Sequence, residues 1–175
     1  MELEMKFKCE DTESVKEKLI ENSFTLDKIK HQIDTYFIVN ETQEDGTRDY
    51  LRVREDKKKN VISLDYHRVL SLLETDEVEV EVVDKEKTMK ILKLLDKNIQ
   101  CEVDKQREQY KKDSVIVTID IVKDLGTFVE IEINGELNAE NEQKLIDTME
   151  LLGLKEKQRI KKQGYPDLLL TSQRK

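Results

Sequence analysis

The first eight residues, Met1 to Lys8, alternate strictly between apolar and charged side chains. Successive side chains of a β-strand point to opposite faces, so this stretch predicts a strand with one apolar and one charged face. The apolar face carries Leu3, Met5 and Phe7, and the charged face carries Glu2, Glu4, Lys6 and Lys8. Two carboxylates beside an ammonium suit a hard cation held next to a phosphate. The alternative is an ordinary amphipathic strand whose charged face lies in water.

Seven later segments also predict strands, at about 28–40, 50–54, 61–67, 75–82, 100–111, 114–122 and 127–134. Apolar residues at helical spacing predict helices after Asp11 and after Asp84, and a third at about 139–152. The order of one strand, one helix and three strands thus occurs twice. It predicts an α+β fold, a closed eight-stranded antiparallel β-barrel built from two similar halves with helices packed outside. Residues 1–175 are expected to form a single domain.

When such a barrel closes, the charged faces of its strands meet in the lumen. They would bring together Glu2, Glu4, Lys6, Arg52, Arg54, Glu79, Glu81, Lys105 or Arg107, Asp120, Glu130 and Glu132. Uncompensated charges are costly when they are removed from water, and clustered carboxylates repel one another. Divalent cations would compensate the carboxylates, and phosphate groups would compensate the Lys and Arg side chains. The pattern therefore predicts a tunnel for a polyphosphate with metal ions.

Composition narrows the choice of partners. The chain is 40% charged with a net charge of −8, which argues against binding to nucleic acid or to an anionic membrane surface. We find no apolar run of membrane-spanning length and no signal-peptide core, so a cytoplasmic location is expected. Cys9 and Cys101 are predicted to be free, packed thiols, with a disulfide as the alternative. Turns are expected at Asp45-Gly46 and at 56–60, where three lysines would lie in solvent.

Five stretches in this order resemble the CYTH proteins, the triphosphate tunnel metalloenzymes. Glu2-Leu3-Glu4-Met5-Lys6 is similar to the family's opening signature, and Leu51-Arg52-Val53-Arg54 and Asp104-Lys105-Gln106-Arg107 are similar to its basic strands. The stretch from Thr118 to Asp120 and the stretch from Leu125 to Glu132 resemble its acidic strand pair. The tail around Tyr165, expected to form a docking turn or helix, resembles its terminal motif. Within the family, the chain looks closest to prokaryotic proteins labelled as class IV adenylyl cyclases.

The resemblance implies a role for each matching residue. Metal binding, of Mg²⁺ or Mn²⁺, would fall by matched position to Glu2, Glu4 and Glu130. Strand parity, and not a family motif, adds Glu132, Glu79 and Glu81 as further ligands. Phosphate binding would fall to Lys6, Arg52, Arg54, Lys105, Arg107 and His67. Lys6, Arg54 and Asp120 would be the catalytic residues, with Asp120 as an orienting carboxylate.

The chain departs from the family at the end of the fourth strand. The family often has a lysine there followed by Gly-Pro, whereas this chain has His67 followed by Arg68-Val69. Histidine is only partly charged near neutral pH, so one phosphate contact would be weaker. The alternative is that His67 is simply a polar residue of the barrel.

The expected function is therefore a metal-dependent enzyme that acts on a triphosphate in a charged lumen. The first candidate reaction is that of a class IV adenylyl cyclase, which converts ATP to cyclic AMP and pyrophosphate. The alternatives are an inorganic or thiamine triphosphatase, and a module that binds nucleotide or polyphosphate without turnover. A homodimer is the default expectation for a small cytosolic enzyme.

Overall fold

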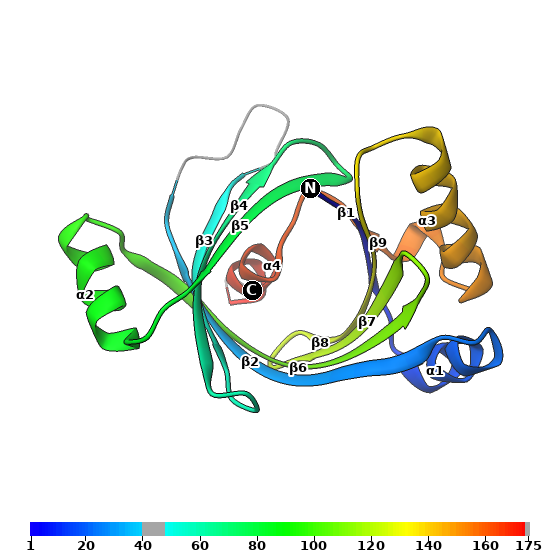
Figure 1. Cartoon of the computed structure of the whole chain (residues 1–175), viewed down its shortest axis with the longest axis horizontal. Coiled ribbons are helices and arrows are strands. Elements are labelled where there is room, and N and C mark those ends of the chain that lie inside the picture. The colour runs from blue at the N-terminus through cyan, green and yellow to red at the C-terminus, as the bar shows by residue number, and fades with distance from the viewer. Residues whose placement is uncertain (40–47, 174–175) are drawn as a thin grey trace.

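A computed structural model describes residues 1–39 and 48–173 of the chain, and its eight main strands form one closed antiparallel barrel (Figure 1). The first half contains β1 (Glu2–Lys8), α1 (Thr12–Glu21), β2 (Thr25–Phe37), β3 (Tyr50–Asp56) and β4 (Val61–Val69). The second half contains β5 (Glu74–Glu81), α2 (Lys85–Leu94), β6 (Ile99–Lys112), β7 (Val115–Val122) and β8 (Gly126–Asn134). The chain ends with α3 (Ala139–Leu151), a short 3₁₀ helix (Glu156–Gln158), β9 (Arg159–Ile160) and α4 (Tyr165–Ser172).

The barrel closes at β1. The strand order runs from β5 through β4, β3, β2, β6, β7 and β8 to β1, and β1 also pairs with β5. In that last pair Glu2 lies opposite Thr75, and Leu3 lies opposite Glu74. The short strand β9 adds to the other part of β1, where Phe7 lies opposite Arg159. Closure pairs the backbone groups that an open sheet would leave at its edges.

The main apolar core lies outside the barrel wall, between the wall and two helices. Leu3 and Phe7 of β1 are fully buried there, together with Leu19 of α1 and Leu145 of α3. Asp11 caps α1 by accepting a hydrogen bond from the backbone N–H of Ser14. Because the apolar side chains of β1 face this outer core, its alternating charged side chains point into the lumen.

The last helix has a different position, since it packs on side chains that point into the barrel. Tyr165 and Leu169 of α4 share a buried cluster with Val103, Val122 and Phe128. In Figure 1, α4 lies within the outline of the ring of strands. The predicted docking of the tail is thus confirmed, and it closes part of the lumen with apolar side chains.

The structure confirms the order of one strand, one helix and three strands in both halves. The predicted limits of β2, about 28–40, were wrong. The strand begins at Thr25 and ends at Phe37. The turn at 57–60 is confirmed, whereas Asp45-Gly46 lies outside the described residues. Cys9 and Cys101 are free. A single domain over 1–175 stays a prediction.

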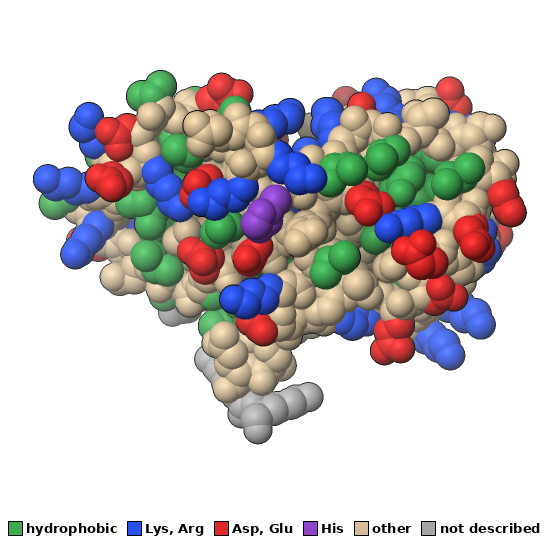
Figure 2. All heavy atoms as spheres, turned by 90° about the horizontal axis from the view of Figure 1, so that it is seen from below, with side chains coloured by type: hydrophobic (Ala, Val, Ile, Leu, Met, Phe, Trp, Pro, Cys, Tyr) green, Lys and Arg blue, Asp and Glu red, His purple; other side chains and the backbone are tan. Residues whose placement is uncertain are grey.

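The outer surface carries both signs of charge. On the face in Figure 2, basic and acidic side chains are interspersed around apolar patches. No helix in the described part of the chain is long and apolar enough to span a membrane.

Phe7 provides a test of the outer core. Its side chain is fully buried between the wall and the helices, so Phe7→Ala is expected to lower the free energy of unfolding by about 3–5 kcal/mol. Urea denaturation measures the change. Leu26→Ala, at a side chain that is 50% exposed, is the matched control and is expected to cost much less. Equal losses in the two variants would contradict the assignment of this core.

Candidate active site

The lumen contains a cavity of about 340 Å³, which is large enough for a small phosphate compound. Nine cationic side chains line it: Lys6, Lys30, Arg48, Arg52, Arg54, Lys105, Arg107, Arg159 and Lys162. Six carboxylates line it too: Glu2, Glu4, Glu77, Glu79, Glu130 and Glu132. The described lining therefore has three more cations than carboxylates, and three aspartates buried behind it, Asp34, Asp65 and Asp120, offset this difference.

Three arginines of this lining are each held by a fully buried aspartate on a neighbouring strand. Arg52 donates to Asp65 from Nε at 2.8 Å. Arg54 makes two hydrogen bonds to Asp34, at 2.7 and 2.9 Å. Arg107 makes the same kind of paired contact with Asp120. Bidentate pairs of this kind fix the plane and the position of a guanidinium.

The strand register explains these pairs. Arg52 lies directly opposite Asp65 between β3 and β4, and Arg54 lies opposite Asp34 between β2 and β3. Arg107 lies opposite Asp120 between β6 and β7. Directly opposite residues of antiparallel strands have their side chains on the same face and close together. The barrel register therefore places each cation beside its anion.

A second group of charges lies where β1 meets β8. One carboxylate oxygen from each of Glu4, Glu130 and Glu132 lies within 4.8 Å of the others. Lys6 lies opposite Glu130 in the register, and its Nζ is 3.1 Å from Glu4 and 3.2 Å from Glu130. Three oxygen ligands in one cluster fit a hard divalent cation such as Mg²⁺ or Mn²⁺.

The protonation of this cluster also fits a cation site. Glu2 is not one of the three clustered residues, but burial raises its pKa to about 7, and repulsion from Glu4, Glu77 and Glu130 adds to the effect. Burial likewise raises the pKa values of Glu4 and Glu132. Carboxylates that are packed together in this way repel one another until a cation, or a proton, compensates them.

Glu130 behaves differently from its neighbours. Burial would raise its pKa, but Arg107 and Lys6 outweigh burial and hold the pKa well below the usual range. Glu130 is therefore ionised at neutral pH and links the metal-type cluster to the basic side chains.

Lys105 and Tyr165 form the inner end of the site. Burial lowers the pKa of Lys105 to about 8, although the nearby Asp34 carboxylate favours the charged form. The Tyr165 hydroxyl of α4 donates to Asp120 at 2.8 Å, and the Lys6 ammonium lies 4.6 Å from the centre of the Tyr165 ring. The terminal helix thus contacts both the basic and the acidic side chains of the lumen.

The structure brings together nearly all the residues that the sequence suggested. Ten of them line the cavity: Glu2, Glu4, Lys6, Arg52, Arg54, His67, Lys105, Arg107, Glu130 and Glu132. Asp120 is fully buried behind Arg107. Glu79 also lines the cavity. Glu81 was wrongly expected in the lumen; it is the last residue of β5, is exposed and is not among the residues that line the cavity.

Sequence reasoning missed several lumen residues, among them Asp34, Tyr36, Asp65 and Glu77. Strand parity could have found these four. Asp34 and Tyr36 lie on the parity opposite to Ile33 and Phe37, and Asp65 shares its parity with His67. Glu77 shares its parity with Glu79. What parity alone could not give is which strands are neighbours, and therefore which arginine each aspartate holds.

Comparison with known proteins decides the family. The family model described as the CYTH domain matches residues 1–163. The chain belongs to the CYTH family. Members of this family are metal-dependent enzymes that act on triphosphates, as cyclases or as triphosphatases.

Individual relatives of this CYTH chain agree. It is 32% identical to Putative adenylate cyclase MJ0240 of Methanocaldococcus jannaschii over 153 residues, which are 87% of each protein. The solved structure of PH1012 from Pyrococcus horikoshii is 29% identical with a TM-score of 0.87, covering 96% of this chain and 99% of that one. A structure from Hippeastrum has a TM-score of 0.66 at 14% identity, covering 99% and 95%. That last likeness shows the fold alone.

The buried ion pairs of this CYTH chain can be tested at Asp34. It contacts Arg54 and lies 3.2 Å from the Lys105 ammonium, so Asp34→Ala leaves two buried cations without their anion. We expect a loss of about 3–5 kcal/mol in the free energy of unfolding. Glu13→Ala is the control, because Glu13 is 80% exposed where it pairs with Lys16. A small effect at Asp34 would show that water enters and solvates the site.

Glu2 gives a prediction for pH. Its folded pKa of about 7 lies above the ordinary 4.5, so the folded state holds this proton more tightly than the unfolded state does. Stability from that proton is present below pH 4.5 and is lost as the pH rises through about 7. In EDTA, Glu2→Gln should therefore gain stability relative to the unmodified chain across this range.

Chemical denaturation at several pH values measures this difference. Glu10→Gln, at an exposed carboxylate, is the control and should show no such gain. Adding Mn²⁺ should stabilise the unmodified chain more than the Glu2→Gln variant, because the variant lacks one carboxylate. A constant difference between the two proteins at all pH values would contradict a raised pKa at Glu2.

Proposed function

We propose that this chain is a metal-dependent enzyme that binds a triphosphate in its lumen, and that its reaction is the cyclisation of ATP to cyclic AMP and pyrophosphate. The observation that carries the proposal is the cavity itself. Its basic side chains, fixed by buried aspartates, face a cluster of three carboxylates. Phosphate oxygens and a divalent cation satisfy these two sets together.

In this proposal, Glu2, Glu4, Glu130 and Glu132 hold the cation, which is Mg²⁺ or Mn²⁺. Such an ion lowers the pKa of a bound hydroxyl group and neutralises charge on phosphate oxygens. The phosphate ligands are Lys6, Arg52, Arg54, Lys105, Arg107 and His67. Cations already fixed in position stabilise charge that develops on the phosphate in the transition state.

Lys6 and Arg54 are the residues proposed to act most directly in the reaction, with Asp120 as the carboxylate that positions Arg107. Burial would lower the pKa of Lys6, but Glu4 and Glu130 outweigh it and raise the pKa. Lys6 therefore stays charged near the cluster and can contact a phosphate oxygen. Asp120 acts by holding Arg107 and by accepting from Tyr165.

For the cyclase reaction, the 3′-oxygen of the ribose attacks the α-phosphorus, and the bond from that phosphorus to the bridging oxygen of pyrophosphate breaks. The proton of the 3′-hydroxyl passes to solvent as the new bond forms, and the leaving pyrophosphate takes one up from solvent. The name of the Methanocaldococcus jannaschii relative supports this reaction, since that protein is 32% identical over most of both chains.

The second candidate is hydrolysis of a triphosphate, inorganic or thiamine triphosphate, in which water attacks the terminal phosphorus. The same cations and carboxylates would serve. The Hippeastrum protein, which shares this fold, is described as having a dominant triphosphatase activity. A binding module without turnover is the remaining alternative. A homodimer and a cytoplasmic location stay predictions.

Phosphorus NMR of the purified chain with Mn²⁺ and either ATP or tripolyphosphate tests these reactions. We expect cyclic AMP and pyrophosphate from ATP. Orthophosphate released mainly from tripolyphosphate would instead establish a hydrolase. Line broadening with no product, in Mn²⁺ and in Mg²⁺, would favour the binding module.

Variants connect the activity to the lumen. Glu130→Gln and Lys6→Gln are each expected to reduce the rate by about 100-fold or more, because each removes a charge that contacts the substrate or its cation. Lys58→Gln, in the exposed turn at 57–60, is the matched control and should retain the full rate. Full activity in Glu130→Gln would contradict the proposed site.

A further inference from the structure

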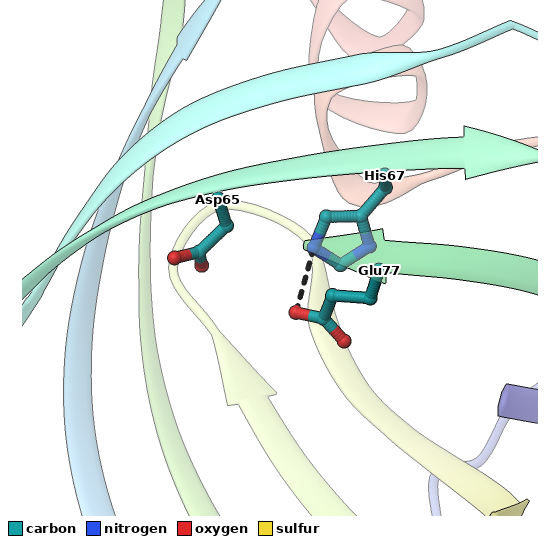
Figure 3. A group of neighbouring side chains, drawn as sticks. All are labelled: Asp65, His67 and Glu77. Atoms are coloured by element: carbon teal, nitrogen blue, oxygen red, sulfur yellow. Dashed lines mark ion pairs between the residues drawn. The ribbon is translucent and has the colours of Figure 1, made fainter. Parts of the chain in front are cut away.

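His67 lies in a second cluster of possible ligands, separate in its residues from the three-glutamate cluster. His67 and Asp65 are two residues apart on β4, so both point into the lumen. Glu77 lies directly opposite His67 on β5. One ligand atom from each of the three lies within 4.8 Å of the others. Figure 3 shows His67 and Glu77 facing each other and joined by the ion pair, with the Asp65 carboxylate to one side of them.

One atom of this cluster is buried without a hydrogen-bond partner among the described residues. It is Oδ1 of Asp65, a side chain with no exposed surface. Nε2 of His67 lies 2.9 Å from Oε1 of Glu77 and forms an ion pair with it. Buried polar atoms in folded proteins nearly always have a partner, and an unsatisfied one is costly. The buried Asp65 oxygen beside the His67–Glu77 pair therefore points to a missing ligand.

The charge around the cluster leaves room for a cation. Arg52 contacts one oxygen of Asp65 and one oxygen of Glu77, at 2.8 and 3.2 Å. Arg54 makes its short contacts to Asp34 and lies 4.0 Å from Asp65. A carboxylate has two oxygens with about four acceptor sites, so Arg52 and a metal ion can share these groups.

A third carboxylate adds to this balance. Glu79 lies opposite Asp65 in the register, on the same face of the sheet. Around the cluster, three carboxylates therefore accompany two guanidinium groups, that of Arg52 in close contact and that of Arg54 at 4.0 Å from Asp65. When all three carboxylates are ionised, they keep one negative charge that the two arginines do not balance.

We propose that Asp65, His67 and Glu77 bind a divalent transition metal ion, with Zn²⁺ as the best fit. An imidazole nitrogen together with carboxylate oxygens suits Zn²⁺ better than Mg²⁺, which takes oxygen ligands. From typical Zn–N and Zn–O bond lengths, ligand atoms around a tetrahedral Zn²⁺ lie about 3.3 Å apart. The 2.9 Å between His67 and Glu77 is already close to that spacing.

Three protein ligands leave the fourth position of Zn²⁺ open. His67 and Glu77 both line the cavity, so an ion held by them would be reached from the lumen. With the ion bound, it would contact water or a phosphate oxygen in place of the direct contact between His67 and phosphate that is proposed above. Since binding of the metal alone defines the site, the inference does not depend on the proposed reaction.

The chain has only two histidines, which makes the test direct. Long-range ¹H–¹⁵N spectra of the full chain report the ring nitrogens of both His31 and His67. Titration with Zn²⁺, without any triphosphate, is expected to shift the His67 ring and to saturate at one ion. The His31 ring, whose Nε2 lies 2.8 Å from Asp104, is expected to keep its position.

Variants separate this site from the others. Asp65→Asn and Glu77→Gln should each weaken Zn²⁺ binding at His67 at least about tenfold. His31→Ala is the matched control and should bind Zn²⁺ as the unmodified chain does. Glu4→Gln alters the three-glutamate cluster and should leave the His67 response in place. Backbone spectra of each variant confirm that it is folded.

Three results would overturn the proposal. One is a His67 ring that does not respond to Zn²⁺. Another is a response that is lost in His31→Ala or in Glu4→Gln. The third is a response that persists in both folded variants, Asp65→Asn and Glu77→Gln. Failure here, with triphosphate turnover intact, would leave the proposed function standing.

Discussion

The structure depends on the pairing of opposite charges across neighbouring strands, away from water. Arg52, Arg54 and Arg107 would each be costly to bury alone, and a fully buried aspartate beside each one compensates it. The same contacts fix the guanidinium groups before any ligand arrives. Stability and readiness to bind phosphate therefore have one origin, and a substitution at an aspartate is expected to affect both.

Much of the fold could be predicted because alternation is a local property of the chain. The pattern in Glu2–Lys8 gave both the strand and the face that enters the lumen, and the structure agrees. The repeated order of elements gave the closed barrel in the same way. The ends of strands were harder to predict, since β2 extends three residues further toward α1 than its pattern suggested.

The site was predicted less completely. The buried aspartates that hold its arginines and lysine depend on which strands are neighbours. Asp34 holds Arg54 and Lys105, yet these residues lie on β2, β3 and β6, far apart in the sequence. The pairing of β2 with β6 joins the two halves of the barrel, and no local pattern indicates it. Tyr165 is similar, since its contact with Asp120 requires α4 to pack inside the ring of strands.

The position of β1 has a consequence for how the chain folds. Strand β1 pairs with β5, β8 and β9, so Glu2 meets Asn134 and Phe7 meets Arg159. Contacts between residues so distant in sequence close large loops, and proteins dominated by them fold slowly. Until β8 arrives, the edge of β1 is open to pairing with another chain. Folding of this barrel is therefore expected to be slow, and sensitive to protein concentration in its early stages.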